Sequence, residues 1–121
     1  MTHAQNKVDW CLRKAEKELH ETGQHRGLVA GKSGNAKAHV DKAEHYLAAT
    51  SYLYDGNFSD ISASTLFYCI YHCLLAITLK FGYESRNQEC TFALIQKLNE
   101  EKKIDLDQNL LNKIASLDDK Q

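Results

Sequence analysis

Leu66–Leu79 reads LFYCIYHCLLAITL, and this stretch determines how the rest of the chain is interpreted. Only His72 and Thr78 are polar, so a helix over these residues is apolar around its whole circumference. Such a helix is either surrounded by protein or crosses a membrane. The run is shorter than the ~20 residues that a bilayer needs, and His72 lies in its middle. The sequence therefore predicts a central core helix and no membrane span.

In a chain of 121 residues, a helix without a solvent face needs cover from all the other helices or from a second chain. We expect a second copy of the chain, which gives a homodimer with this helix at or near the interface. The candidate interface residues are Phe67, Ile70, Tyr71 and Leu74.

Apolar residues recur at helical spacing on both sides of the core helix. Asn35, Ser59 or Asp60, and Asn87 are the candidate N-caps, and Gly82 is placed to end the core helix. The expected helices cover residues 6–21, 36 to 54 or 55, about 60–81, 88–102 and, more weakly, 107–117.

The segments between these helices read as loops. Four of the six glycines lie within residues 23–34, and the chain has no proline, so few residues are available to turn many short strands. The sequence predicts one domain over residues 1–121, an all-α, up-and-down bundle of four to five helices. Its core covers about residues 6–102, and a short C-terminal helix and a frayed tail follow over 103–121.

Charge and cysteine content indicate the compartment and the ligand class. The net charge is −1, which argues against a broad basic surface for nucleic acid. Residues 1–5 lack the features of a signal peptide, so we expect a cytoplasmic protein with reduced, buried thiols. Cys69 and Cys73 flank His72 at metal-ligand spacing, but no second ligand pair accompanies them. We expect neither a metal nor another cofactor.

His72 and the tyrosines are the candidate polar groups of the apolar region. A buried imidazole needs a hydrogen-bond partner, so His72 is either a satisfied core or interface residue or lines a cleft with Tyr68 and Tyr71. All six tyrosines lie between residues 46 and 83. Such side chains suit helix packing, an interface between chains, or the stacking of unpaired bases.

An ordered series of segments resembles the HEPN superfamily, specifically a small prokaryotic branch of it. The resemblance covers roughly residues 8–100. Its segments are Gly27-Leu28-Val29, KAEHYL at 42–47, FSDISASTLFYCIYHCLLAI at 58–77 and GYESRNQECTFALI at 82–95.

The resemblance implies a helical bundle that pairs into a dimer and associates with nucleic acid or nucleotides. Many members of the superfamily are metal-independent RNases, which use an arginine followed, after four to six residues, by a histidine near the start of a late helix. Others are non-catalytic and partner a minimal nucleotidyltransferase, often as a toxin–antitoxin pair.

This chain departs from the RNase motif. Arg86-Asn87 stands where the family has its arginine and polar residue, but the positions for the histidine hold Thr91, Phe92 and Ala93. None of these three side chains can act as a general acid or base near neutral pH. A literal match from Arg13 to His20 lies in the first helix, outside the required context, and is interpreted as chance.

We therefore expect a non-enzymatic, dimeric HEPN module that binds a partner protein, such as a nucleotidyltransferase, or nucleic acid. Arg86 is the candidate for holding a phosphate, and Asn87, His72, Tyr68 and Tyr71 are candidates for lining the same groove. Two alternatives stay open. One is a divergent RNase that uses Arg86 with His72 or with an imidazole of the facing subunit, and the other is nucleotide binding without turnover.

Overall fold

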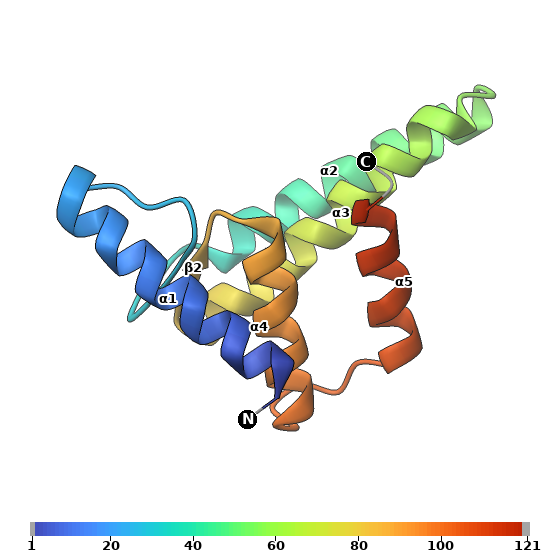
Figure 1. The fold of residues 1–121 in the computed structure, drawn as a ribbon. Helices are drawn as coiled ribbons and strands as arrows, with labels where there is room; N and C mark the ends of the chain where they lie inside the picture. The colour runs from blue at the N-terminus through green and yellow to red at the C-terminus, as the bar shows by residue number, and fades with distance from the viewer. Residues whose placement is uncertain (1, 120–121) are drawn as a thin grey trace.

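The structure is a computed structural model that describes residues 2–119, and it is built almost entirely of helices (Figure 1). The prediction of an all-α bundle is confirmed at this level. Lys120 and Gln121, the end of the predicted frayed tail, lie outside the described residues. The elements are α1 (His3–Thr22), β1 (Leu28–Ala30), α2 (Ala36–Asp55), α3 (Ser59–Lys80), β2 (Tyr83–Ser85), α4 (Gln88–Glu100) and α5 (Gln108–Asp119).

Asparagine side chains begin two of these helices, as predicted. The Asn35 side chain accepts a hydrogen bond from the Ala38 N–H at the start of α2, at 3.1 Å. The Asn87 side chain accepts one from the Cys90 N–H at the start of α4, at 2.9 Å. Each bond satisfies a backbone donor that has no partner within its helix, which fixes where the helix begins.

The predicted cap of α3 is wrong. Ser59 is already the first helical residue, and Phe58 occupies the cap position without a side-chain hydrogen bond. The turn after α2 is tight, with Asn57 in the left-handed region at a φ of 68°, so the chain re-enters a helix at once. At the other end Gly82 takes a φ of 86°, which glycine adopts readily, and α3 stops where expected.

A short antiparallel ribbon pairs two segments that were both expected to be loops, the glycine-rich one before α2 and the connector after Gly82. Leu28 pairs with Ser85 and Ala30 with Tyr83, and beyond the last pair the Arg86 N–H donates to the Gly27 carbonyl at 2.7 Å. Three-residue strands are too short to show the alternation that identifies a strand in a sequence. The ribbon places the residues around 27 beside those around 86.

The C-terminal half of α3 lies in the core. Its buried residues pack against α4 and α5, while α1 packs on α4 and β1 to form a second part of the core. The central role predicted for this helix is therefore right for about half of its length. The core residues are Val8, Cys11, Leu28, Cys90, Leu94 and Leu98 in one cluster, Leu74, Ile95, Leu111 and Ile114 in the next, and Phe67, Tyr71 and Leu75 in a third.

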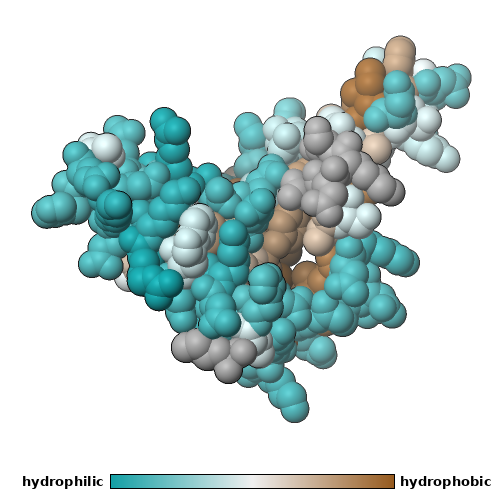
Figure 2. Space-filling view, in the orientation of Figure 1, coloured by the Kyte–Doolittle hydropathy of each residue, from teal (hydrophilic) through white to brown (hydrophobic). Residues whose placement is uncertain are grey.

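The other half of α3 projects from the body together with the end of α2 (Figure 1). Large apolar side chains stay exposed on this hairpin, and Figure 2 shows hydrophobic residues at its far end. By length and composition α3 could also cross a membrane, but core helices pass the same test, and its packing gives it that role. The exposed residues are Leu47, Tyr52, Tyr54, Phe58, Ile61 and Leu66.

The cysteines differ from the prediction of four reduced thiols. Cys11 of α1 and Cys90 of α4 form a disulfide, with their Cα atoms 6.1 Å apart, whereas Cys69 and Cys73 are free. The bond follows from the packing of α1 on α4, which no spacing along the sequence reveals. Disulfides persist mainly in oxidising compartments, so the cytoplasmic location stays a prediction.

Candidate functional site

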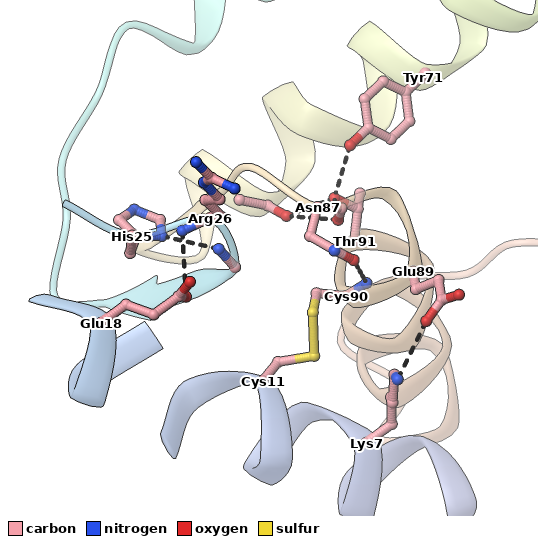
Figure 3. The surroundings of a disulfide bond; sticks show 12 residues. Lys7, Cys11, Glu18, His25, Arg26, Tyr71, Asn87, Glu89, Cys90 and Thr91 are labelled. Atoms are coloured by element: carbon pink, nitrogen blue, oxygen red, sulfur yellow. Dashed lines mark hydrogen bonds and ion pairs between the residues drawn. A yellow bond between two sulfur atoms is a disulfide. The ribbon is translucent and has the colours of Figure 1, made fainter. Parts of the chain in front are cut away.

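The residues that were expected to share one groove are brought together only in part: Tyr71 is linked to Asn87 through the Thr91 hydroxyl, which donates to the Asn87 carbonyl at 2.9 Å. Arg86 and Asn87 are at the junction of β2 and α4, whereas His72 and Tyr68 are on α3. Tyr71 belongs to the core: its hydroxyl contacts the Thr91 hydroxyl at 3.1 Å (Figure 3). Its ring stacks on Phe67, with the ring centroids 6.0 Å apart.

His72 pairs with a residue that sequence reasoning missed. The Nδ1 atoms of His39 and His72 are 3.0 Å apart, and the Tyr46 ring stacks on His72. Tyr68 contacts Tyr46 in turn. Tyr46 follows His39 by seven positions, which places both on one face of α2, and this spacing is the only sequence signal for the cluster. Burial lowers the pKa of both imidazoles, and the His39 and Lys42 charges lower that of His72 further.

Three of the four predicted interface residues are covered by this chain. Phe67 has no exposed surface, and Tyr71 and Leu74 are buried as well. They pack on residues of α4 and α5, such as Phe92 and Ile95, because those helices cover this face of α3. Within one chain these three side chains are already packed, whereas Ile70 is half-buried, and their place in an interface stays a prediction.

Arg86 lies on the wall of a cavity of about 500 Å³ between α1, the residues just before β1 and the first turn of α4. The cavity is also lined by Trp10, a residue that is 46% exposed. Its other cationic side chains are Lys14 and Arg26. These three residues come from the first helix and from the glycine-rich segment, neither of which was expected to contribute.

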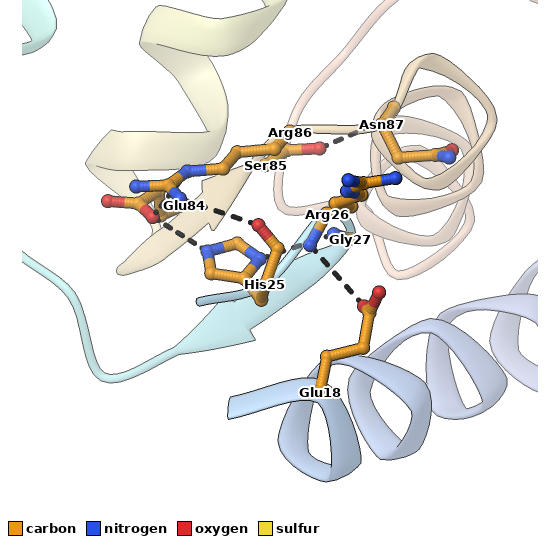
Figure 4. Close-up of polar contacts among 8 residues, drawn as sticks. All are labelled: Glu18, His25, Arg26, Gly27, Glu84, Ser85, Arg86 and Asn87. Atoms are coloured by element: carbon orange, nitrogen blue, oxygen red, sulfur yellow. Dashed lines mark hydrogen bonds and ion pairs between the residues drawn. The ribbon is translucent and has the colours of Figure 1, made fainter. Parts of the chain in front are cut away.

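The guanidinium of Arg86 is partly engaged. Its Nε lies 3.3 Å from a Glu84 carboxylate oxygen, and its Nη1 donates to the His25 carbonyl at 3.4 Å. Figure 4 shows Arg86 turned toward Glu84, whereas the Arg26 side chain extends toward Asn87 at the start of α4. Arg26 is thus better placed than Arg86 to meet a ligand at this end of the cavity.

His25 links the two sides of the ribbon through its ring nitrogens and is not available as a general base. Its Nε2–H donates to Glu84 at 2.7 Å, and its Nδ1 accepts from the Gly27 N–H at 3.2 Å. Both ring nitrogens are occupied, and the residue is buried. The hydrogen bond from His25, together with the Arg86 charge, holds the pKa of Glu84 below its ordinary value.

Two acidic side chains, Glu18 and Glu89, also line the cavity, but neither forms an ion pair with Lys14 or Arg26. Glu89 pairs with Lys7 at 3.2 Å, and Glu18 accepts the backbone N–H of Arg26 at 3.3 Å. The Lys14 ammonium lies over the Trp10 ring, 4.9 Å from its centroid. Among the side chains of residues 2–117, no carboxylate is within ion-pair distance of the Lys14 ammonium or the Arg26 guanidinium.

This arrangement suits binding better than catalysis. An exposed indole can stack on a flat ring, and a guanidinium and an ammonium can hold a phosphate beside it. The cavity brings no unoccupied imidazole to these groups. Within the part of the chain that the structure describes, no group of three or more metal-ligating side chains gathers.

Comparison with protein-family models, with curated proteins and with solved structures gives no match to this chain.

Proposed function

We propose that the chain is a non-catalytic, HEPN-type helical module that binds single-stranded nucleic acid in the cavity of Trp10, Lys14, Arg26 and Arg86. The observation that carries the proposal is the pair of unpaired cations, Lys14 and Arg26, beside an exposed indole. A nucleotide that stacks its base on the Trp10 ring can place its phosphate between the Lys14 ammonium and the Arg26 guanidinium and so pair with both charges. The HEPN resemblance points to the same ligand class.

The modest net charge of −1 fits a local site of this kind. Non-specific binding over a broad surface needs many phosphate contacts. For a single strand, each contact steepens the slope of log affinity against log salt concentration by about 0.7. Two or three contacts give weak binding with a shallow salt dependence. We therefore expect the protein to hold one or two nucleotides of a strand and to leave the rest free.

The geometry gives less support to a divergent RNase. Within one chain His72 pairs with His39 on the α2–α3 hairpin, and His25 is occupied on both nitrogens. Cleavage would need a general base from another copy. Nucleotide binding without turnover uses the same cavity, so the choice between a nucleotide and a strand is left to the binding experiment.

We also propose that two copies associate through the projecting hairpin. Residues 46–66, which make up the projecting part, contain no lysine or arginine, and Asp55 and Asp60 are their only acidic residues. An apolar surface so poor in charge is typical of the core of a homodimer interface. A nucleotidyltransferase is the protein partner that the resemblance suggests, and co-purification from the native host tests it.

Fluorescence anisotropy with a labelled ten-nucleotide RNA strand tests nucleic-acid binding. We expect Arg26→Ala and Lys14→Ala each to weaken binding about tenfold, because charge-assisted hydrogen bonds to a phosphate contribute roughly 1.5 kcal/mol. Arg13→Ala and Lys17→Ala are matched controls, since both residues are exposed on α1 and neither lines the cavity. Equal binding by all four variants would contradict the proposal.

Two further arms separate the alternatives. Competition with mononucleotides distinguishes nucleotide binding from strand binding, because a nucleotide that displaces the strand at equal affinity makes the strand unnecessary. Gel analysis of the RNA after incubation, with and without EDTA, tests for cleavage. We expect intact RNA, and cleavage that Arg86→Ala abolishes would restore the RNase alternative.

A further inference from the structure

We propose that the Cys11–Cys90 disulfide is a redox switch for the cavity: the oxidised form holds it in its binding shape, and reduction by a dithiol loosens it. The inference rests on the proposed function, because it concerns the regulation of the same site. It arises from the place of the bond in the fold.

The disulfide joins the two walls of the cavity directly (Figure 3). Cys11 lies between Trp10 and Lys14 on α1, and both half-cystines line the cavity. Cys90 is in the first turn of α4, where its N–H binds the Asn87 side chain. One covalent bond therefore sets the separation between the stacking surface on α1 and the start of α4.

Reduction has to move these walls apart. Two sulfur atoms that are no longer bonded separate from about 2 Å to an ordinary contact of roughly 3.5–4 Å. Cys11 and Cys90 are both buried where α1 packs on α4, and this packing fits the bonded sulfur atoms. Their separation on reduction shifts the two helices relative to each other, and Trp10 moves with α1.

The rest of the interface keeps the reduced chain folded. Val8 of α1 packs in one apolar cluster with Leu94 and Leu98 of α4. Further along α1, Ala15 faces Gly27 of the segment before β1, where a Cβ added to Gly27 would lie 3.5 Å from the Ala15 Cβ. These contacts do not involve the sulfur atoms, so reduction alters the spacing of the walls without releasing α1.

The reaction is ordinary thiol–disulfide exchange. A thiolate of the dithiol attacks one sulfur of the bond and forms a mixed disulfide, and its second thiolate resolves that intermediate. Cys11 and Cys90 gain two electrons and two protons and become thiols, while the dithiol becomes a disulfide. Reoxidation by a disulfide of the same class reverses each step.

The experiment equilibrates the protein in dithiol–disulfide buffers, counts free thiols by alkylation and mass spectrometry, and measures three properties of each form. Helix content comes from circular dichroism, the shape of the cavity from the emission of Trp10, the one tryptophan of the chain, and affinity from the RNA strand. We expect two free thiols to become four, unchanged helix content, altered Trp10 emission and about tenfold weaker binding, all reversed by reoxidation.

Variants separate this bond from the other thiols. Cys11→Ala with Cys90→Ala should bind like the reduced protein in either buffer. Cys69→Ala with Cys73→Ala is the matched control and should respond like the wild type, because neither residue lines the cavity. A reduced protein that binds as tightly as the oxidised one, or that loses its helix content, would overturn the switch.

A failure of the proposed function gives a different result. In that case the RNA strand binds neither the oxidised nor the reduced form. The switch is then tested by the emission of Trp10 and by amide hydrogen exchange in α1 and the first turn of α4. A reversible change in both upon reduction, with helix content kept, supports the switch without the ligand. No change in either refutes it.

Discussion

Trp10 is the aromatic residue around which the proposed site is built. Lys7 and Lys14 both place their ammonium groups over its ring, at 4.5 and 4.9 Å from the centroid. An indole that faces two cations at the mouth of a cavity can exchange one of them for the face of a base. Its partial exposure is then a property of the site and not a packing defect.

Substitution of Trp10 tests this stacking role. We expect Trp10→Ala to weaken binding of the RNA strand by about 1–3 kcal/mol, the usual contribution of one stacked base. Trp10→Phe should retain most of the affinity, because phenylalanine keeps a π-face. Binding that is unaffected by Trp10→Ala in the anisotropy experiment would remove the indole from the site.

The His39–His72 pair gives a prediction about pH. One Nδ1 must donate and the other accept, and burial lowers the pKa of both below the ordinary 6.5. As the pH falls below 6.5, the unfolded chain takes up protons first, so the stability that the pair contributes is complete above that pH and is lost below it.

Urea unfolding between pH 8 and pH 5 checks this sign. The wild type should lose unfolding free energy as the pH falls from 6.5 to 5, and His39→Asn with His72→Asn should lose less over the same interval. His45→Asn is the control, since this residue is exposed on the same helix. The same pH dependence in the double variant and the wild type would show that the pair does not set it.

At the scale of elements, the two asparagine caps allow a matched comparison. Asn87→Ala and Asn35→Ala each remove one capping bond, so each should cost about 1 kcal/mol of unfolding free energy in urea. Asn87 also lines the cavity, whereas Asn35 does not. We therefore expect only Asn87→Ala to weaken RNA binding, and equal losses of affinity in both variants would contradict this.

The α2–α3 hairpin carries the prediction about association. Tyr52 is 82% exposed and Phe58 51% exposed at its far end. Burying such side chains against a second copy contributes about 25 cal/mol for each Å² removed from water, which favours a dimer. We expect light scattering to give about twice the chain mass of 13.8 kDa.

Charged substitutions on the hairpin should break this association. Phe58→Asp with Ile61→Asp should give a monomer with unchanged helix content. Leu110→Asp is the matched control, because Leu110 is similarly exposed but lies on α5. A monomeric wild type would refute association through the hairpin.

The helices were predictable from the sequence because periodicity and caps are local signals. The ribbon was not, since Leu28–Ala30 and Tyr83–Ser85 are too short to alternate and their pairing depends on the tertiary fold. For the cavity, Trp10 and Lys14 are four apart on one face of α1, which was a detectable signal. Arg26 lies among glycines, and nothing local distinguishes it.

At the scale of the whole molecule, the disulfide closes a long loop, because 79 positions separate Cys11 from Cys90. A disulfide restricts the unfolded chain, so removing this one typically lowers the free energy of unfolding by about 2–4 kcal/mol. Cys11→Ala with Cys90→Ala should therefore unfold at lower urea concentration than Cys69→Ala with Cys73→Ala. A smaller loss in the first pair than in the second would contradict the chain-entropy account.

The central claim is that the cavity between α1 and α4 binds a nucleic-acid strand. The most direct measurement is an NMR titration of isotope-labelled protein with a short, single-stranded RNA. We predict shifts in the Trp10 indole N–H and in the amides of Gly27, Arg86 and Asn87, with the hairpin tip around Phe58 unchanged. Shifts confined to the hairpin, or none at saturating RNA, would contradict the claim.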